Sequence, residues 1–316
     1  MGDVKQWGIP YCGSKNKIVE WVAAHFPKRD NFYDLFLGGG AVTHYCAMNR
    51  MFKRYNVNDM SGMAVRLFND AVSGRIGDAP KYYERQEFYD VRYDNPFIGT
   101  IFSFGNNGVN YFCNYDKNEG YRAIYNYVVF GDKSGWTDFF GCEPTTCDNI
   151  PLDNMEERYR AYRGGADYDK VKERFPNNDL MTRYLRIKSL SEVGGVIDTR
   201  HDMTFHIGGY DDIVIKPNSL IYCDIPYSKT WGTNKYGQKN RKNTFDRDRF
   251  IEWCMEQTEP VIVSEYEMPE DKFICIGEKR RCSTMDSRHN TNFYIEKLFI
   301  PKHQYEQYEE IKPTLF

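Results

Sequence analysis

A short apolar strand, a glycine turn, a helix and a second strand follow one another near the start of the chain, and this order constrains the fold most. We expect the strands at residues 32–36 and 54–59, where apolar and aromatic residues fill a strand's length. Gly38-Gly39-Gly40 lies between them and precedes a helical stretch to about residue 51. This is a βαβ unit, which pairs its strands in parallel and predicts an α/β fold.

The pattern of helices and strands continues in the C-terminal part of the chain. Apolar residues at helical spacing predict helices over residues 16–26, 63–72 and 179–190. Strands are expected at residues 203–207, 219–223, 260–264, 273–276 and 293–300, the last two as an antiparallel hairpin. The acidic tail from His303 is expected to be peripheral.

Residues 74–178 interrupt this pattern. They are rich in Tyr, Asn, Gly, Phe and Asp and show no sustained period. A stretch of this length is too long for a loop inside a compact domain. We therefore expect a discontinuous domain of residues 1–73 and 179–316, with an inserted domain of residues 74–178.

Composition narrows the class of protein. The 316 residues carry a net charge of −3 and the pI is about 6.1, so no global basic field favours a polyanion. Aromatic residues make up 16%, which core packing explains first and base stacking second. Nine cysteines without an apolar N-terminal leader favour free thiols in a cytoplasmic protein. No long apolar stretch and no CxxC spacing occur, so we expect neither a membrane span nor a metal site.

The run L-I-Y-C-D-I-P-Y at residues 220–227 ends an apolar strand in a carboxylate, a proline and an aromatic ring. Open α/β folds bind ligands at this end of their strands. Asp224, the backbone carbonyl of Ile225 and the ring of Tyr227 suit the binding of a planar exocyclic amine. Cys223 is interpreted as strand packing, because no base partner for a thiol nucleophile is evident.

The glycine turn predicts a second ligand contact. Gly38 and Gly40 let the backbone approach a ligand, and the following helix offers its first amides. Val42 and Thr43 stand where a pyrophosphate motif would have its third glycine, so S-adenosylmethionine is a candidate donor. A mere tight turn remains an alternative. Asp59 could accept hydrogen bonds from ribose hydroxyls or cap the helix after it.

Three motifs in order resemble one family. I-P-Y-C-G-S-K at residues 9–15, D-L-F-L-G-G-G-A-V at 34–42 and D-I-P-Y at 224–227 resemble the D12 class of DNA adenine N6-methyltransferases, the Dam-like enzymes. Phage-borne members look especially similar, including at residues 263–271 and 296–300. The resemblance implies a class I Rossmann-like S-adenosylmethionine-dependent core with an inserted, mostly helical target-recognition domain. It also implies methyl transfer to adenine N6 in a short double-stranded DNA motif after base flipping.

The family's functional positions can be placed on this chain. Tyr11 and Lys15 match the donor pocket, Asp59 the ribose-binding acid, Asp224 the catalytic acid and Tyr227 the ring that stacks on the target base. Core packing for Tyr11 and a solvated cation at a helix start for Lys15 remain alternatives. The predicted catalytic residues are Asp224, Ile225, Pro226 and Tyr227. The predicted donor-binding residues are Tyr11, Lys15, Asp34, Phe36, Gly38, Gly40, Asp59, Tyr210 and Asp224.

Two positions depart from the family pattern. Ile225 stands where the family has proline, so the strand end lacks a ring that fixes φ, although the carbonyl remains. Gly209 precedes Tyr210 where the family usually has an acid for the donor's adenine amino group. Asp211 or Asp212 could take over that hydrogen bond.

Two segments are candidates for DNA contact. Residues 229–249 carry seven Lys or Arg against two Asp, with aromatic residues between them, and suit a loop that closes over phosphates. A solvated loop is the alternative, and Lys279-Arg280-Arg281 with Arg288 forms a second patch. Residues 102–114 resemble a recognition segment, in which amides read adenine edges or simply form turns. The predicted DNA contacts are Asn106, Asn107, Asn110, Asn114, Lys235, Lys239, Arg241 and Lys242.

Other functions remain open at this level. An amino-methyltransferase that acts on RNA or on a protein glutamine would carry a similar tetrad. A catalytically inactive DNA-binding or donor-binding homologue would explain both departures, and a nicotinamide dehydrogenase is disfavoured by the glycine pattern. We expect a monomer or weak dimer, and a GATC recognition sequence is only a family-level guess.

Overall fold

The computed structural model describes residues 6–175, 180–226, 245–282 and 293–312. The chain divides into two compact units. Unit 1 comprises the N-terminal segment to Trp7, Lys15–Val65 and the chain from Val193 onward. Unit 2 comprises Gly8–Ser14 and Arg66–Glu192.

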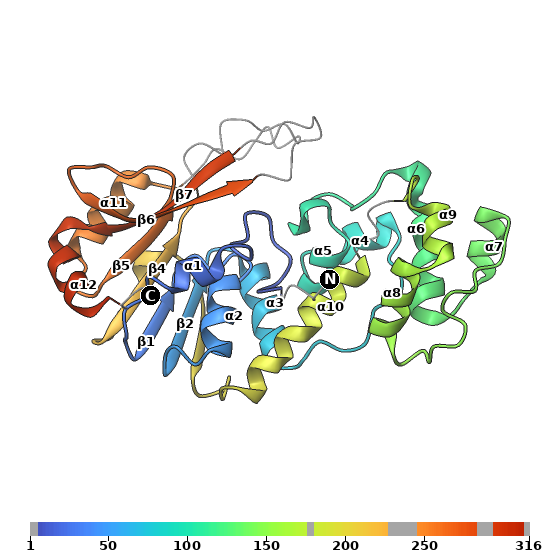
Figure 1. Ribbon diagram of the computed structural model, residues 1–316, viewed down its shortest axis with the longest axis horizontal. Coiled ribbons are helices and arrows are strands. Elements are labelled where there is room, and N and C mark those ends of the chain that lie inside the picture. The colour runs from blue at the N-terminus through green and yellow to red at the C-terminus, as the bar shows by residue number, and fades with distance from the viewer. Residues whose placement is uncertain (1–5, 176–179, 227–244, 283–292, 313–316) are drawn as a thin grey trace. The chain divides into compact units, whose positions relative to one another are not determined.

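Unit 1 contains a seven-stranded sheet of order β3-β2-β1-β4-β5-β7-β6. The strands β3, β2, β1, β4 and β5 run parallel, and β7 is antiparallel to both of its neighbours. In Figure 1 the colours change abruptly across the sheet, because β1 lies beside β4, nearly two hundred residues later. The strands are β1 (Asn31–Asp34), β2 (Arg54–Asp59), β3 (Met203–Ile207), β4 (Ser219–Asp224), β5 (Val261–Glu265), β6 (Phe273–Cys282) and β7 (Phe293–Pro301).

The sequence predicted all seven strands, including the final antiparallel hairpin. One boundary differs widely. The strand expected to end at residue 276 runs to Cys282, because the pairing register shifts between Cys275 and Gly277 and the ladder then continues. A β-bulge of this kind leaves one extra residue unpaired, and the strand pairing resumes after it.

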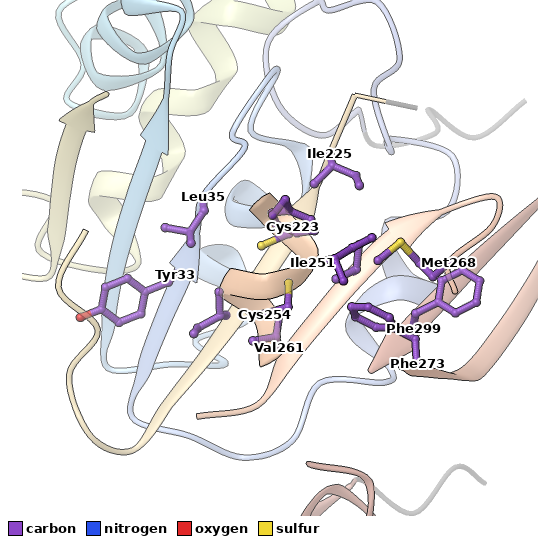
Figure 2. Packing of buried hydrophobic residues seen from close by; sticks show 13 residues of the cluster. Tyr33, Leu35, Cys223, Ile225, Ile251, Cys254, Val261, Met268, Phe273 and Phe299 are labelled. Carbon is purple, nitrogen blue, oxygen red and sulfur yellow. The ribbon is translucent and has the colours of Figure 1, made fainter. Parts of the chain in front are cut away.

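Helices cover both faces of the sheet in unit 1. On one face, α11 packs against side chains of β1, β4 and β5, and Figure 2 shows Ile251 and Cys254 beside Leu35 and Cys223. On the other face, the hydroxyl of Tyr55 donates to a backbone carbonyl of α2 at 3.0 Å. The helices are α1 (Val19–Ala23), α2 (Ala41–Met48), α11 (Arg247–Glu256) and α12 (Tyr305–Ile311), with 3₁₀ turns at Tyr210–Asp212 and Lys302–Gln304.

The C-terminal tail is part of the core of unit 1, and the expectation that it is peripheral is wrong. Tyr308 on α12 is 3% exposed, and its hydroxyl donates to the carbonyl of His25 at 3.1 Å. Gln304 accepts from the amide of Val261 and donates to the carbonyls of Gln257 and Glu259. The prediction was based on the acidic residues of the tail, which are exposed, and it overlooked the residues that face inward.

Unit 2 is helical apart from an isolated bridge between Ser103 and Tyr111, within the part of it that the structure describes. Its bounds are wider than the insert expected at residues 74–178. The side chain of Arg183 donates to the carbonyls of Ile101 and Ser103, so the helix after residue 179 packs within this unit. Its helices are α4 (Arg85–Val91), α5 (Pro96–Ile101), α6 (Tyr115–Phe130), α7 (Ser134–Phe140), α8 (Met155–Gly164), α9 (Ala166–Val171) and α10 (Leu180–Ser189), with a 3₁₀ turn at Phe104–Asn106. Two elements span the boundary between the units: α3 (Gly62–Val72) begins in unit 1 and continues into unit 2, and the 3₁₀ turn at Leu190–Gly195 begins in unit 2 and continues into unit 1.

Candidate active site

The strand order reverses between β1 and β4, and acidic residues end the strands there. Asp34 ends β1, Asp224 ends β4 and Asp59 ends β2, all at the carboxyl edge. In an open α/β sheet, the crevice at such a reversal is where ligands bind. The sheet therefore brings three of the predicted site residues together.

Asp34 is the most deeply buried of the three carboxyl groups. Its side chain is 2% exposed, and Oδ2 accepts a hydrogen bond from the hydroxyl of Thr43 at 2.6 Å. Oδ1 is buried without a hydrogen-bond partner among the described residues. Burial raises the pKa of Asp34 to about 7, the Thr43 hydrogen bond opposes that shift, and the charges of Asp224 and Asp59 add to it. A buried, unpaired acceptor of this kind suits a cationic ligand group.

Lys15 links β4 to β7. Its ammonium lies 2.5 Å from Oδ1 of Asp224 and 3.7 Å from Oε1 of Glu296. Lys15 is 3% exposed, so the alternative of a solvated cation is wrong. Glu296 is fully buried and accepts a hydrogen bond from Ser264 at 3.2 Å. A buried ammonium between two carboxylates fixes the position of Asp224, whose side chain remains 23% exposed.

Sequence reasoning did not assign a role to Glu296. The residue lies between Ile295 and Lys297 in β7 and is fully buried, which is unusual for a carboxylate. An acidic residue within a predicted strand was a signal in the sequence. Its partner Lys15, however, lies near the other end of the chain, and only the folded sheet brings the two together.

Asp59 ties the second strand to the glycine turn. Its Oδ2 accepts from the amide of Gly38 at 2.8 Å, and Oδ1 accepts from the amide of Ser61 at 2.7 Å. Ser61 itself accepts from the amide of Ala64 in the first turn of α3, so Ser61 rather than Asp59 caps that helix. Burial raises the pKa of Asp59, while both backbone hydrogen bonds lower it. Each carboxylate oxygen keeps capacity for a further donor such as a ribose hydroxyl.

Two residues of the glycine turn adopt left-handed backbone conformations. Gly38 and Gly40 have φ values of 49° and 64°, a region that strains side chains other than glycine. Gly40 is the N-cap of α2. The first amides of a helix have no partner within the helix and favour an anionic group.

Phe36 and Tyr210 form an aromatic surface beside this turn. Their rings stack with centroids 5.5 Å apart and planes inclined by 27°. Tyr210 also contacts the rings of Phe250 and Trp253 on α11. Asp211, one of the two candidates for the missing acid, forms an ion pair with Arg249. Asp212 accepts from the amide of Gly209 at 3.1 Å.

Ile225 compensates in part for the absent proline. Its side chain is 1% exposed and lies in the core with Cys223 and Met268 (Figure 2). Packing of this side chain in the core restrains the strand end, where a proline ring would fix φ. Cys223 is fully buried, which agrees with its interpretation as strand packing. Pro226 is half-buried, and Tyr227 lies outside the described residues.

The remaining predicted residues belong to unit 2 or fall outside the described residues. Tyr11 belongs to unit 2, where it is 37% exposed and its carbonyl accepts from the amide of Ser14 at 3.3 Å. Asn107, Asn110 and Asn114 are exposed in unit 2. Asn106 adopts a φ of 60°, and its side-chain nitrogen is buried without a partner in the described part of the chain. The predicted DNA contacts Lys235, Lys239, Arg241 and Lys242 lie outside the described residues.

The residues at this edge fit S-adenosylmethionine by their chemistry. Asp34 offers an unpaired buried acceptor for a cationic group, and the start of α2 offers amides for a carboxylate. Asp59 offers acceptors for hydroxyls, and Phe36 with Tyr210 offers an aromatic surface. No group of His, Cys, Asp or Glu that could hold a metal occurs among the described residues.

A seven-stranded sheet with helices and an acidic site at its strand reversal is consistent with a methyltransferase fold. Residues 11–132 match the family model of the D12 class N6 adenine-specific DNA methyltransferases, which confirms the resemblance found in the sequence. The matched region includes Lys15, the glycine turn and Asp59, and it ends before Asp224. No curated protein matches the chain. Within the described residues, no helix is both long and apolar enough to cross a membrane.

Proposed function

We propose that this protein transfers a methyl group from S-adenosylmethionine to N6 of adenine in a short double-stranded DNA motif. The observation that carries the proposal is Asp224 at the strand reversal, ion-paired to buried Lys15, in a chain whose residues 11–132 match the D12 class. Unit 1 is the proposed catalytic domain and unit 2 the proposed target-recognition domain.

Asp224 and the carbonyl of Ile225 would each accept one N6–H hydrogen bond. The N6 lone pair of adenine is delocalised into the ring, which makes the nitrogen a poor nucleophile. Two acceptors draw the nitrogen toward tetrahedral geometry and stabilise the positive charge that develops during transfer. The carbon–nitrogen bond would form as the carbon–sulfur bond breaks to leave a neutral thioether, and N6 would then lose one proton to solvent. Lys15 contributes by holding Asp224 in one position, at 2.5 Å from its Oδ1. Because Asp224 is already held in position, its carboxylate could accept the N6–H hydrogen bond without a rearrangement of surrounding water.

The donor would be held by Asp34, Asp59, the glycine turn and the aromatic surface of Phe36 and Tyr210. When bound, S-adenosylmethionine supplies an electrophilic methyl group on a sulfonium centre. Positioning of reactants in this way can contribute roughly 7–11 kcal/mol to lowering a barrier. Asp34 and Asp224 end adjacent strands, so the donor and acceptor sites would adjoin.

The target base must leave the duplex to reach Asp224. Extrusion costs a few kcal/mol, and stacking on an aromatic ring returns about 1–3 kcal/mol per base. Tyr227 is the proposed ring. The asparagines at positions 106, 107, 110 and 114 and the basic residues at 235, 239, 241 and 242 are proposed DNA contacts.

Asp224→Asn tests the catalytic assignment. An amide keeps the side chain's shape but loses the charge that stabilises the amine, so we expect the methylation rate on duplex DNA to fall roughly 10²–10³-fold. Initial rates with radiolabelled donor on DNA, RNA and protein measure it, and modification-sensitive sequencing of host DNA locates the motif. Asp30→Asn, at the opposite edge of the sheet and 45% exposed, is the matched control.

Each outcome separates the proposal from its alternatives. Adenine methylation in one short DNA motif, lost in Asp224→Asn and retained in Asp30→Asn, supports it. Label that enters RNA or protein and not DNA would favour the other amino-methyltransferases. No modified adenine with the parent protein would favour an inactive homologue.

A further inference from the structure

The hairpin of β6 and β7 continues past the edge of the sheet. Glu265, the last residue of β5, pairs with Lys297, whereas β6 and β7 remain paired with each other as far as Cys282 and Phe293. Residues 279–282 and 293–296 thus form a two-stranded segment that β5 does not reach, which we call the projecting ribbon. In Figure 1 both red strands run on together beyond β5.

The projecting ribbon leaves the sheet on the side of the candidate active site. Because β5 is parallel to β4, its end at Glu265 lies at the carboxyl edge where Asp224 ends β4. Glu296, at the base of the ribbon, lies 3.7 Å from Lys15, which in turn contacts Asp224. Two side-chain contacts therefore connect the ribbon to the proposed catalytic carboxylate.

The ribbon exposes both basic and large apolar side chains, a combination that is unusual for a hairpin that contacts only solvent. Lys279 and Arg280 on β6 are exposed, and Glu278 is already paired with Lys297 at 3.1 Å. On β7, Tyr294 is 42% exposed and Ile295 is 49% exposed, although they point to opposite faces. Cations with exposed aromatic and aliphatic groups on both faces favour a polyanion that also offers apolar surface.

One aromatic group of the ribbon is held in place. Tyr294 stacks on Tyr266, with ring centroids 5.9 Å apart and planes inclined by 25°. Tyr266 directly follows Glu265, whose carboxylate is ion-paired with Arg247 at 2.6 Å. A restrained aromatic group loses less conformational entropy on binding than a free one.

We propose that the projecting ribbon binds the DNA duplex beside the target adenine, with Lys279 and Arg280 at phosphates. Tyr294 and Ile295, on opposite faces of the ribbon, would each face one wall of a groove. The proposal rests on the proposed function, since it gives that function a DNA-contacting surface in unit 1. A two-stranded ribbon, with strands about 4.8 Å apart, fits the major groove, which is about 12 Å wide.

The test measures binding to a fluorescent duplex across a series of NaCl concentrations, with anisotropy as the readout. Each cation at a phosphate releases counterions, so its removal lowers the slope of log affinity against log salt by about one. We expect Lys279→Ala/Arg280→Ala to lower the slope by about two and to weaken binding at low salt. Donor affinity, measured by calorimetry, should stay unchanged.

Lys28→Ala/Arg29→Ala is the matched control, an adjacent Lys-Arg pair that precedes β1 at the opposite edge of the sheet. Lys279→Gln/Arg280→Gln repeats the test with longer side chains should the alanine pair alter thermal stability. Suppose that the parent protein binds and methylates DNA and that the ribbon variant keeps the parent's salt slope and affinity. That result overturns the ribbon proposal alone. A parent that neither binds nor methylates duplex DNA overturns the proposed function and the ribbon with it.

Discussion

At the scale of single residues, the site depends on carboxyl groups in unlike surroundings. Asp34 is enclosed, with one oxygen bonded to Thr43 and the other without a partner among the described residues. Asp224 is partly exposed and lies against the ammonium of Lys15. Burial favours the neutral form of the first carboxyl group, whereas the second is held in an ion pair. Such a difference lets adjacent strand ends serve different ligand groups.

Asp34 makes stability depend on pH. Its pKa is raised from 3.8 to about 7 in the folded chain, so the native state binds a proton more tightly than the unfolded chain does. The contribution of this proton to the free energy of unfolding is fully present below about pH 4. It is lost as the pH rises to about 7. We expect Asp34→Asn, which retains an acceptor for Thr43, to flatten the decrease in free energy of unfolding between pH 5 and 8. Urea unfolding at several pH values measures this, and equal slopes in variant and parent would contradict it.

At the scale of elements, close packing around the bulge in β6 determines where that strand can lie. Gly277 passes against His25, so that a Cβ atom added there would lie 2.5 Å from the ring Nε2. The ring has little freedom to move, because it is 6% exposed and its Nδ1 contacts the carbonyl of Trp21 at 2.8 Å. The glycine is needed for this approach of strand and helix.

Gly277→Ala should therefore destabilise unit 1. Overpacking of this kind costs typically about 1–3 kcal/mol in the free energy of unfolding. Gly195→Ala is the control, since a Cβ atom there meets nothing within 4 Å. Denaturant titration of both variants compares them. Equal denaturation midpoints for the two variants would show that the His25 ring can move aside without loss of stability.

At the scale of the whole molecule, unit 1 is assembled from segments that lie far apart in the sequence. The first helix, the paired strands β1 and β4, and the last helix all contribute to it. Tyr308 reaches the carbonyl of His25, 283 residues earlier, and is 3% exposed. The tail thus joins the segment before β1 to the start of β5.

Removal of this contact tests the role of the tail. Tyr308→Ala should cost about 3–5 kcal/mol in the free energy of unfolding, as is usual when a large buried aromatic group is removed. Glu310→Ala, exposed on the same helix, should change it by no more than about 0.5 kcal/mol. Thermal and urea unfolding report both. A peripheral tail would instead leave the two variants alike.

The sequence by itself determined the local elements and indicated the acidic residues that end β1, β2 and β4. Alternating apolar residues gave β2 and β3 their bounds, the glycines marked the turn after β1, and the carboxylate at position 224 marked the end of β4. These signals act over a few residues, because side-chain periodicity and turn chemistry are local properties.

Only the tertiary structure decided which residues meet. Four features depend on contacts between residues far apart in the chain. They are the adjacency of β1 and β4, the contact of Lys15 with Glu296, the wider bounds of unit 2 and the burial of Tyr308. Such pairings are set by the packing of the whole sheet. No window of the sequence contains both partners, so local patterns could not reveal them.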